Sequence, residues 1–339
     1  MSDTSETSDT TGVPSTDGNA GRSRRTVLRA AVAGAGAGAV AAVGAGATAA
    51  EAASRPARAV TFVMVHGAGS NSYGLATWAA ELGLRGHRAV AVDLPGHGSG
   101  AYFPLSYQAP QDLERLRTEP SPLGKVTLKD YADHVEAVVR RARRNGPVVL
   151  VGQSLGGATV NAVANRIPEL IDHLVYASAF CPAQRKTVLE LMSAPEAATS
   201  MLFRMTAVPT PPELGVNRVN WRSNDPQFFA VCKEALGADY TDAEVRAVMN
   251  TLEPDEAASI SVSDAHGLPE QWGRIPRTFL KFTEDRAIPP ALQDLMIREA
   301  DELTPGNRFR VRPLAAPHAG PRDPAVVAGE LELVARLCL

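Results

Sequence analysis

The chain has 339 residues, of which 45% are hydrophobic and 21% are charged, with a formal net charge of −3. This is the balance of a globular protein of one large or two small domains. The small net charge gives no reason to expect nucleic acid or an anionic membrane surface as a partner. Cys181, Cys232 and Cys338 could form at most one disulfide, which excludes a disulfide scaffold, and no Cys/His spacing resembles a zinc site.

Residues 1–52 differ in composition from the rest of the chain. Residues 1–21 are rich in Ser, Thr, Asp and Gly, which predicts disorder. Arg24 and Arg25 then precede a weakly apolar Ala/Gly/Val stretch at 30–50, a pattern typical of a twin-arginine export signal. A transmembrane helix is the alternative, but Ala and Gly supply little transfer free energy to hold it in lipid. We therefore expect a secreted or extracytoplasmic protein without stable membrane association after signal cleavage.

Strands and helices are predicted to alternate over the rest of the chain. Runs of apolar, β-branched residues indicate strands, and apolar residues at helical spacing indicate helices. This alternation predicts an α/β fold with a mostly parallel, doubly wound sheet and helices on both faces. In chain order we expect a strand at 59–65, a helix at 75–85, a strand at 87–92, a helix at 127–146, a strand at 148–151, a helix at 156–166, strands at 173–180 and 277–282, a helix at 292–300, a strand at 309–314 and a helix at 325–337.

Two segments interrupt this alternation. Residues 101–125 form an irregular loop with several prolines, long enough to indicate a functional role. Residues 182–274 are mostly helical in pattern and lie between two predicted strands. In a parallel sheet, reacting groups lie at the carboxyl ends of the strands, so we expect the functional residues where the predicted strands end.

Ser154 lies at the end of one such strand, in the sequence VVLVGQSLGGATV at 148–160. The apolar run becomes a helix within a few residues, and a turn this sharp crowds the neighbouring chain. Gly152 and Gly156 have no Cβ, so strand and helix can approach closely. The pattern is typical of a nucleophile elbow, which presents the serine hydroxyl at the start of a helix. A plain strand–helix turn with a capping serine is the alternative.

A serine hydroxyl is a poor nucleophile unless a base takes its proton. Among seven histidines, His318 follows the last predicted strand in PLAAPHAGPRDP, and its loop leaves the sheet on the side of the serine. His266, in the segment between strands, is the alternative base. The other histidines lie in glycine-containing turns, at strand starts or within a helix, and they are His66, His97, His87, His173 and His134.

An acid that orients the imidazole is expected after the strand that precedes the His318 loop. KFTEDRAIPP at 281–290 offers Glu284 and Asp285, and a turn at the following Ile-Pro pair would direct Asp285 toward His318. The strand at 173–180 ends in Ala-Phe-Cys and offers no acid. Asp285 is therefore the predicted acid, and Glu284 is the alternative.

Backbone N–H groups should meet the negative charge that develops on a substrate oxygen. Leu155 follows the serine at the start of a helix, so its N–H is one predicted donor. The second is expected from the turn after the first strand, at Ala68 in VHGAG.

Five motifs in order resemble the α/β-hydrolase fold superfamily over residues 59–339: VHGAG, VDLPGHGSG, GQSLGG, FTEDRAIPP and the His318 loop. The order Ser, Asp, His along the chain is also that of this superfamily. The resemblance implies a core at 53–181 and 275–339 with a helical cap inserted at 182–274.

Within the superfamily, FVMVHGAGSNSYGLATWAAEL and VTLKDYADHVEAVV look most like the plant methylesterases and hydroxynitrile lyases. The lyases of that group carry a threonine after the histidine of the first turn and a lysine after the catalytic histidine. This chain has Gly67 and Ala319 there, which favours ester hydrolysis over cyanohydrin cleavage.

The resemblance implies a serine hydrolase that acts on small to medium, apolar carboxylic esters or lactones and needs no metal or organic cofactor. Gln153, Tyr102, Phe103 and Trp221 are the candidate pocket residues. Two alternatives share the scaffold. One is a lyase, perhydrolase or cyclase, and the other is a ligand-binding protein that retains the three side chains. The fold alone does not decide among them.

Overall fold

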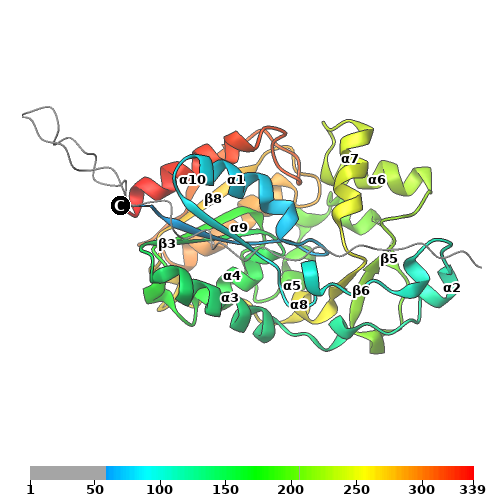
Figure 1. Cartoon of the computed structure of the whole chain (residues 1–339). Helices are drawn as coiled ribbons and strands as arrows, with labels where there is room; N and C mark the ends of the chain where they lie inside the picture. The colour runs from blue at the N-terminus through cyan, green and yellow to red at the C-terminus, as the bar shows by residue number, and fades with distance from the viewer. Residues whose placement is uncertain (1–58, 206) are drawn as a thin grey trace, which may run out of the picture. The chain divides into compact units, whose positions relative to one another are not determined.

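The structure, a computed structural model, describes residues 59–205 and 207–339. The predicted export signal lies outside these residues and stays a prediction. Figure 1 shows a central sheet with helices above and below it. Its strands are β1 (Thr61–Val65), β2 (Arg88–Val92), β3 (Val148–Ser154), β4 (His173–Ala179), β8 (Arg277–Phe282) and β9 (Arg310–Leu314).

The six strands lie in the order β2-β1-β3-β4-β8-β9, and every neighbouring pair is parallel. The predicted α/β hydrolase fold is thereby confirmed. Parallel strands share one carboxyl edge, so the ends of β3, β8 and β9 lie along the same side of the sheet. The inner strands β1, β3 and β4 are almost completely buried, whereas the edge strands β2 and β9 are largely exposed.

The two faces of the sheet have separate apolar cores, because successive side chains of a strand point to opposite faces. Phe62 and Met64 of β1 pack with α1 (Ala76–Leu84) and α10 (Pro324–Leu337). Val63 and Val65 pack with the helices of the other face, whose bounds are Leu128–Arg143 for α3, Gly156–Ala164 for α4 and Pro290–Leu303 for α9. Figure 1 shows α1 and α10 above the sheet and α3 and α4 below it.

The segment between β4 and β8 contains a small sheet as well as helices. Its three strands pair antiparallel in the order β5-β6-β7, which hydrophobic periodicity does not predict because the strands are too short to show a period. Trp221, Phe228 and Met249 belong to a small apolar core of this segment. The elements are α5 (Val188–Met192), β5 (Ala207–Val208), β6 (Val216–Val219), α6 (Pro226–Leu236), α7 (Asp242–Thr251), β7 (Asp255–Ala257) and α8 (Ala258–Val262).

A buried ion pair joins β6 to β7 and to the loop before α3. The Arg218 guanidinium donates to both carboxylate oxygens of Asp255, at 2.6 and 2.8 Å. It also donates to the carbonyl oxygens of Leu116, in the short helix α2 (Leu113–Leu116), and Glu119. Arg218 and Asp255 are both buried, so water cannot replace these bonds if one partner is removed.

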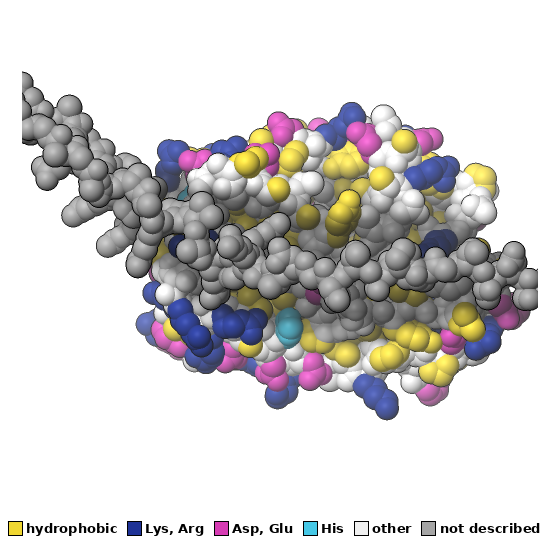
Figure 2. Space-filling view, viewed as in Figure 1, with side chains coloured by type: hydrophobic (Ala, Val, Ile, Leu, Met, Phe, Trp, Pro, Cys, Tyr) yellow, Lys and Arg dark blue, Asp and Glu magenta, His cyan; other side chains and the backbone are white. Residues whose placement is uncertain are grey.

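Acidic and basic side chains are interspersed on the surface. Figure 2 shows both signs around the rim of one face. In the described part of the chain, no helix combines the length and the apolarity needed to cross a membrane.

The three cysteines are unpaired. Cys181 and Cys232 are buried, and Cys338 is half-buried. Burial raises the pKa of the Cys181 and Cys232 thiols to about 12 and that of Cys338 to about 11.

Replacing Arg218 tests the buried ion pair. Arg218→Ala leaves Asp255 as a buried, unpaired charge, and we expect the free energy of unfolding to fall by about 3–5 kcal/mol. The control is Arg140→Ala, which removes an exposed pair with Glu136 and should cost less than about 1 kcal/mol. Urea unfolding followed by circular dichroism measures both. Equal losses in the two variants would contradict the importance of the Arg218 pair.

Candidate active site

Ser154 is the last residue of β3, and α4 begins two residues later. Its φ of +53° lies in the left-handed region, which is costly for a residue with a side chain. The strand and the helix come as close as the sequence predicts. A Cβ on Gly152 would stand 3.0 Å from the Gly157 backbone, and one on Gly156 would stand 2.5 Å from the His66 carbonyl oxygen. The local sequence therefore holds the serine at a sharp, crowded turn.

Ser154, His318 and Asp285 form a hydrogen-bonded row. His318 Nε2 lies 3.0 Å from Ser154 Oγ, and His318 Nδ1 lies 2.6 Å from Asp285 Oδ2. Because a carboxylate only accepts, Nδ1 carries the proton toward Asp285 and leaves Nε2 to accept the serine hydroxyl proton. All three residues are buried. The predicted alternatives lie elsewhere, since Glu284 is exposed and His266 Nδ1 bonds to Asp264.

Asp285 accepts four hydrogen bonds, which fix the direction of its carboxylate. Oδ1 accepts from the backbone N–H groups of Ala287 and Ile288, at 2.7 and 2.8 Å. Oδ2 accepts from His318 and from the hydroxyl of Ser178, the latter at 2.5 Å. The turn expected at the Ile-Pro pair is thus the source of two donors.

Ser178 is a residue that sequence reasoning missed. It lies near the end of β4, where the pairing register with β3 shifts so that Ser154 pairs with Ala179, and its φ is +39°. A serine in an otherwise apolar strand end, HLVYASAF, was the available signal.

A model of the Alpha/beta hydrolase family matches residues 62–330, which include the whole Ser–His–Asp row. The chain belongs to the Alpha/beta hydrolase family. Methylesterase 18 of Arabidopsis thaliana is 26% identical to this hydrolase over 247 residues, 70% of this chain and 83% of that protein. Salicylic acid-binding protein 2 of Nicotiana tabacum is 24% identical over 236 residues, 68% and 82% of the two chains. The solved structure of a pyrethroid hydrolase from Sphingobium faniae JZ-2 has a TM-score of 0.64 at 20% identity, covering 82% and 98% of the two chains.

The two predicted oxyanion donors of this hydrolase flank the serine. Leu155 precedes α4, where backbone N–H groups have no partner within the helix. Gly67, beside Ala68, lies so close to Ser154 that an added Cβ would stand 2.6 Å from the serine Cβ. Within the described residues, neither the Ala68 nor the Leu155 N–H donates a hydrogen bond. Their role as oxyanion donors stays a prediction.

The four candidate pocket residues have different surroundings. Gln153 Nε2 donates to the His318 carbonyl oxygen at 3.3 Å, so it contacts the loop that carries the histidine. Trp221 Nε1 donates to the Glu253 carbonyl oxygen, and the indole borders the turn at Gly69. The Tyr102 hydroxyl donates to Glu119, and Phe103 is 38% exposed and packs near Tyr107. Tyr102 and Phe103 thus have partners of their own within or near the loop at 101–125, and their role in a pocket stays a prediction.

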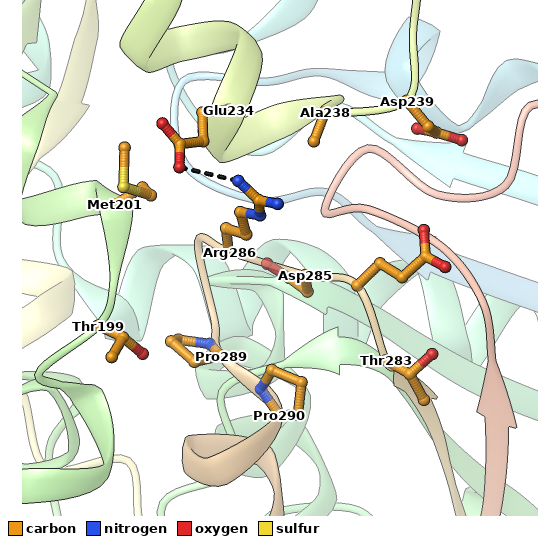
Figure 3. Close-up of a pocket in the computed structure, with 11 residues that line it drawn as sticks. Thr199, Met201, Glu234, Ala238, Asp239, Thr283, Asp285, Arg286, Pro289 and Pro290 are labelled. Carbon is orange, nitrogen blue, oxygen red and sulfur yellow. Dashed lines mark hydrogen bonds and ion pairs between the residues drawn. The ribbon is translucent and has the colours of Figure 1, made fainter.

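A pocket of about 660 Å³ lies outside the loop that carries Asp285. Figure 3 shows Arg286 in this pocket, paired with Glu234 of α6, and Pro289 and Pro290 below it. Asp285 is the one member of the Ser–His–Asp row that lines this pocket, and its side chain is almost completely buried. The pocket therefore lies behind the acid and is separate from the serine.

Ser178→Ala tests the support of Asp285. The substitution removes one of four hydrogen bonds to a carboxylate, a loss of about 1.5 kcal/mol or more, so we expect the second-order rate of phosphonate addition to Ser154 to fall about tenfold. Mass spectrometry of the labelled protein measures this rate. Ser259→Ala is the control, because the Ser259 hydroxyl donates to the Val126 carbonyl oxygen, away from the site. Equal labelling rates in the two variants would show that Ser178 has no such role.

Proposed function

We propose that this chain is an exported serine hydrolase that cleaves small to medium, apolar carboxylic esters or lactones. The observation that carries the proposal is the unbroken row from Ser154 Oγ through His318 to Asp285, at the carboxyl edge of the sheet. Such a row turns a weakly nucleophilic hydroxyl into an attacking group. The methylesterase among its relatives supports ester bonds as the target.

In the proposed mechanism, Ser154 Oγ attacks the substrate carbonyl carbon while His318 Nε2 takes the hydroxyl proton. Asp285 stabilises the imidazolium that results. The N–H groups of Ala68 and Leu155 donate to the oxygen on which negative charge develops. His318 then protonates the leaving alcohol, and a water molecule, activated by the same histidine, hydrolyses the acyl-enzyme. Ser154 is released with its proton, and the balance needs no metal or organic cofactor.

Gly67 supports hydrolysis over cyanohydrin cleavage. A Cβ at this position would stand 2.6 Å from Ser154 Cβ and 3.1 Å from Ser154 Oγ. The threonine of the resembling hydroxynitrile lyases would therefore require the serine to move.

Ser154→Ala tests the proposed reaction. The substitution removes one oxygen atom from the turn, so we expect little change in stability and a loss of several orders of magnitude in turnover of an activated ester such as 4-nitrophenyl butyrate. Asp285→Asn should lower kcat strongly with the fold intact, because the imidazole loses its orienting charge. Ser259→Ala should retain the parent activity. Undiminished turnover by Ser154→Ala would overturn the proposal, and ligand retention without turnover in the parent would favour the binding-protein alternative.

The export part of the proposal rests on the paired arginines before an Ala/Gly/Val stretch. Replacing Arg24 and Arg25 together by lysine should keep the protein in the cytoplasm of a host with a twin-arginine pathway. Immunoblots of cytoplasmic and exported fractions measure this. Replacing Arg22 and Arg29 by lysine is the control, since it changes as many arginines outside the pair. Unchanged export of the Arg24/Arg25 variant would exclude the twin-arginine route.

A further inference from the structure

Four buried side chains form a hydrogen-bonded group beside the turn that carries Ala68. We call His97, Tyr131, Glu253 and Glu256 the His97 cluster. Their exposed fractions are 1%, 1%, 4% and 6%. His97 follows β2, Tyr131 belongs to α3, and the two glutamates lie between α7 and the end of β7, in the segment inserted between β4 and β8. The cluster thus joins the core of the fold to its insert.

The hydrogen bonds of the cluster run outward from His97, to Glu253 on one side and through Tyr131 to Glu256 on the other. Glu253 Oε2 lies 2.6 Å from His97 Nδ1, and His97 Nε2 lies 2.8 Å from the Tyr131 oxygen. The Tyr131 hydroxyl donates its single proton to Glu256 Oε1 at 2.8 Å, so Nε2 is the donor to Tyr131. Both ring nitrogens of His97 then carry protons. Burial lowers the pKa of His97, but the bond to Glu253 and the ion pair of Nε2 with Glu256 Oε2, at 3.6 Å, outweigh it and raise this pKa to about 9.

One imidazolium therefore faces two carboxylates, and the second of them, Glu256, has further donors besides His97. Burial raises the pKa of Glu256, but bonds from its neighbours, first among them His97, outweigh burial and leave it lowered. One of these neighbours is the backbone N–H of Gly69, which donates to Glu256 Oε2 at 2.9 Å. The charge of Glu256 is thus balanced in part by the turn that follows β1.

The turn at residues 67–70 is fixed from both ends. At one end, the His66 ring bonds to the Gly67 carbonyl oxygen at 2.9 Å and accepts from the Leu94 N–H. Burial and the nearby charge of His97 lower the pKa of His66 to about 4, so this ring is neutral at pH 7 and donates through Nδ1. At the other end, Gly69 donates to Glu256, and its carbonyl oxygen accepts from the Glu253 N–H at 2.7 Å.

Ala68 lies between these two fixed residues, and its own N–H has no partner in the described part of the chain. Gly69 has a φ of +57°, and a Cβ there would stand 3.0 Å from the Glu253 carbonyl oxygen, so the turn and the insert are in direct contact. The peptide plane that carries the Ala68 N–H is therefore constrained by Gly67 on one side and by Gly69 on the other.

We propose that Glu256 is a positioning residue for the reaction: by holding the Gly69 N–H, it directs the Ala68 N–H toward the oxygen bound at Ser154. Tyr131 acts one step further away by linking Glu256 to His97. The inference rests on the proposed hydrolase activity, in which that oxygen becomes negatively charged. Neither residue touches the substrate, and both act through the conformation of the 67–70 turn.

The test compares Glu256→Gln and Tyr131→Phe with Glu299→Gln. Glu299 is a matched control, because it is buried like Glu256, with exposed fractions of 4% and 6%, and bonds to Arg185, outside the His97 cluster. Loss of one oxyanion donor lowers kcat by about 10²–10³. A donor that is only misdirected still contributes in part, so the loss in kcat should be smaller. We expect kcat per phosphonate-titrated site to fall about 10- to 100-fold in Glu256→Gln and about threefold or more in Tyr131→Phe, with KM changed less than about threefold.

A trifluoromethyl ketone distinguishes positioning from general destabilisation. It adds to the serine and places an oxyanion at the Ala68 and Leu155 N–H groups, as the reaction does. Its inhibition constant should therefore rise by the same factor as kcat/KM falls, while the affinity for the carboxylic acid product stays within about twofold. Glu299→Gln should change neither constant.

Hydrogen–deuterium exchange measures the order of the 67–70 turn independently of any enzymatic activity. Peptides that contain residues 67–72 should exchange faster in Glu256→Gln than in the parent and in Glu299→Gln. Unchanged exchange there would overturn the inference, as would faster exchange with unchanged kcat and ketone affinity. If Glu256→Gln does not fold, the same measurements on Tyr131→Phe test the inference. If the parent protein neither hydrolyses esters nor reacts with the phosphonate, the proposed function is wrong. Hydrogen–deuterium exchange then tests only whether Glu256 orders the 67–70 turn.

Discussion

The close approach of β3, α4 and their neighbours is the constraint on which the site depends. A Cβ on Gly157 would stand 1.9 Å from the Phe180 carbonyl oxygen, and one on Gly156 would stand 2.6 Å from that of Val65. These contacts join the elbow to β1 on one side and to β4 on the other. Larger residues would push α4 away from the sheet, and the serine would no longer meet a histidine that comes from the far edge at β9. The strained φ of Ser154 persists because the surrounding backbone leaves it no room to relax.

The sequence predicts the sheet and the Ser–His–Asp row well, for physical reasons. The buried strands are runs of apolar residues, and parallel strands bring their ends together, so position along the chain already places Ser154, Asp285 and His318 at one edge. The strand β3 is longer than expected, because Gly-Gln-Ser reads as a turn but continues the ladder to Ser154. The choice of Asp285 over Glu284 follows from a turn that the Ile-Pro pair indicates.

Several features of the fold and of the site cannot be predicted from the hydrophobic periodicity of the sequence. Ser178 matters through a register shift between two strands, and a register shift is a property of the assembled sheet. The small sheet β5-β6-β7 is held by the Arg218–Asp255 pair, whose members lie far apart in the sequence. The same is true of Glu256, whose bond to Gly69 spans 187 residues. The aromatic character of Tyr102 and Phe103 suggests a pocket, but it carries no information on their neighbours Glu119 and Tyr107.

The unpaired cysteines determine how the folded and the unfolded chain react with an oxidant. A thiol reacts with oxidants and disulfides as the thiolate, and burial raises the pKa of Cys181 and Cys232 to about 12, so both are thiols at pH 7. Both sulfur atoms are also buried, so a dissolved reagent has no direct access to them in the folded protein. In the unfolded chain all three thiols regain ordinary reactivity and can form wrong disulfides. A chain that folds before it meets an oxidant therefore avoids wrong disulfides, because the fold buries Cys181 and Cys232.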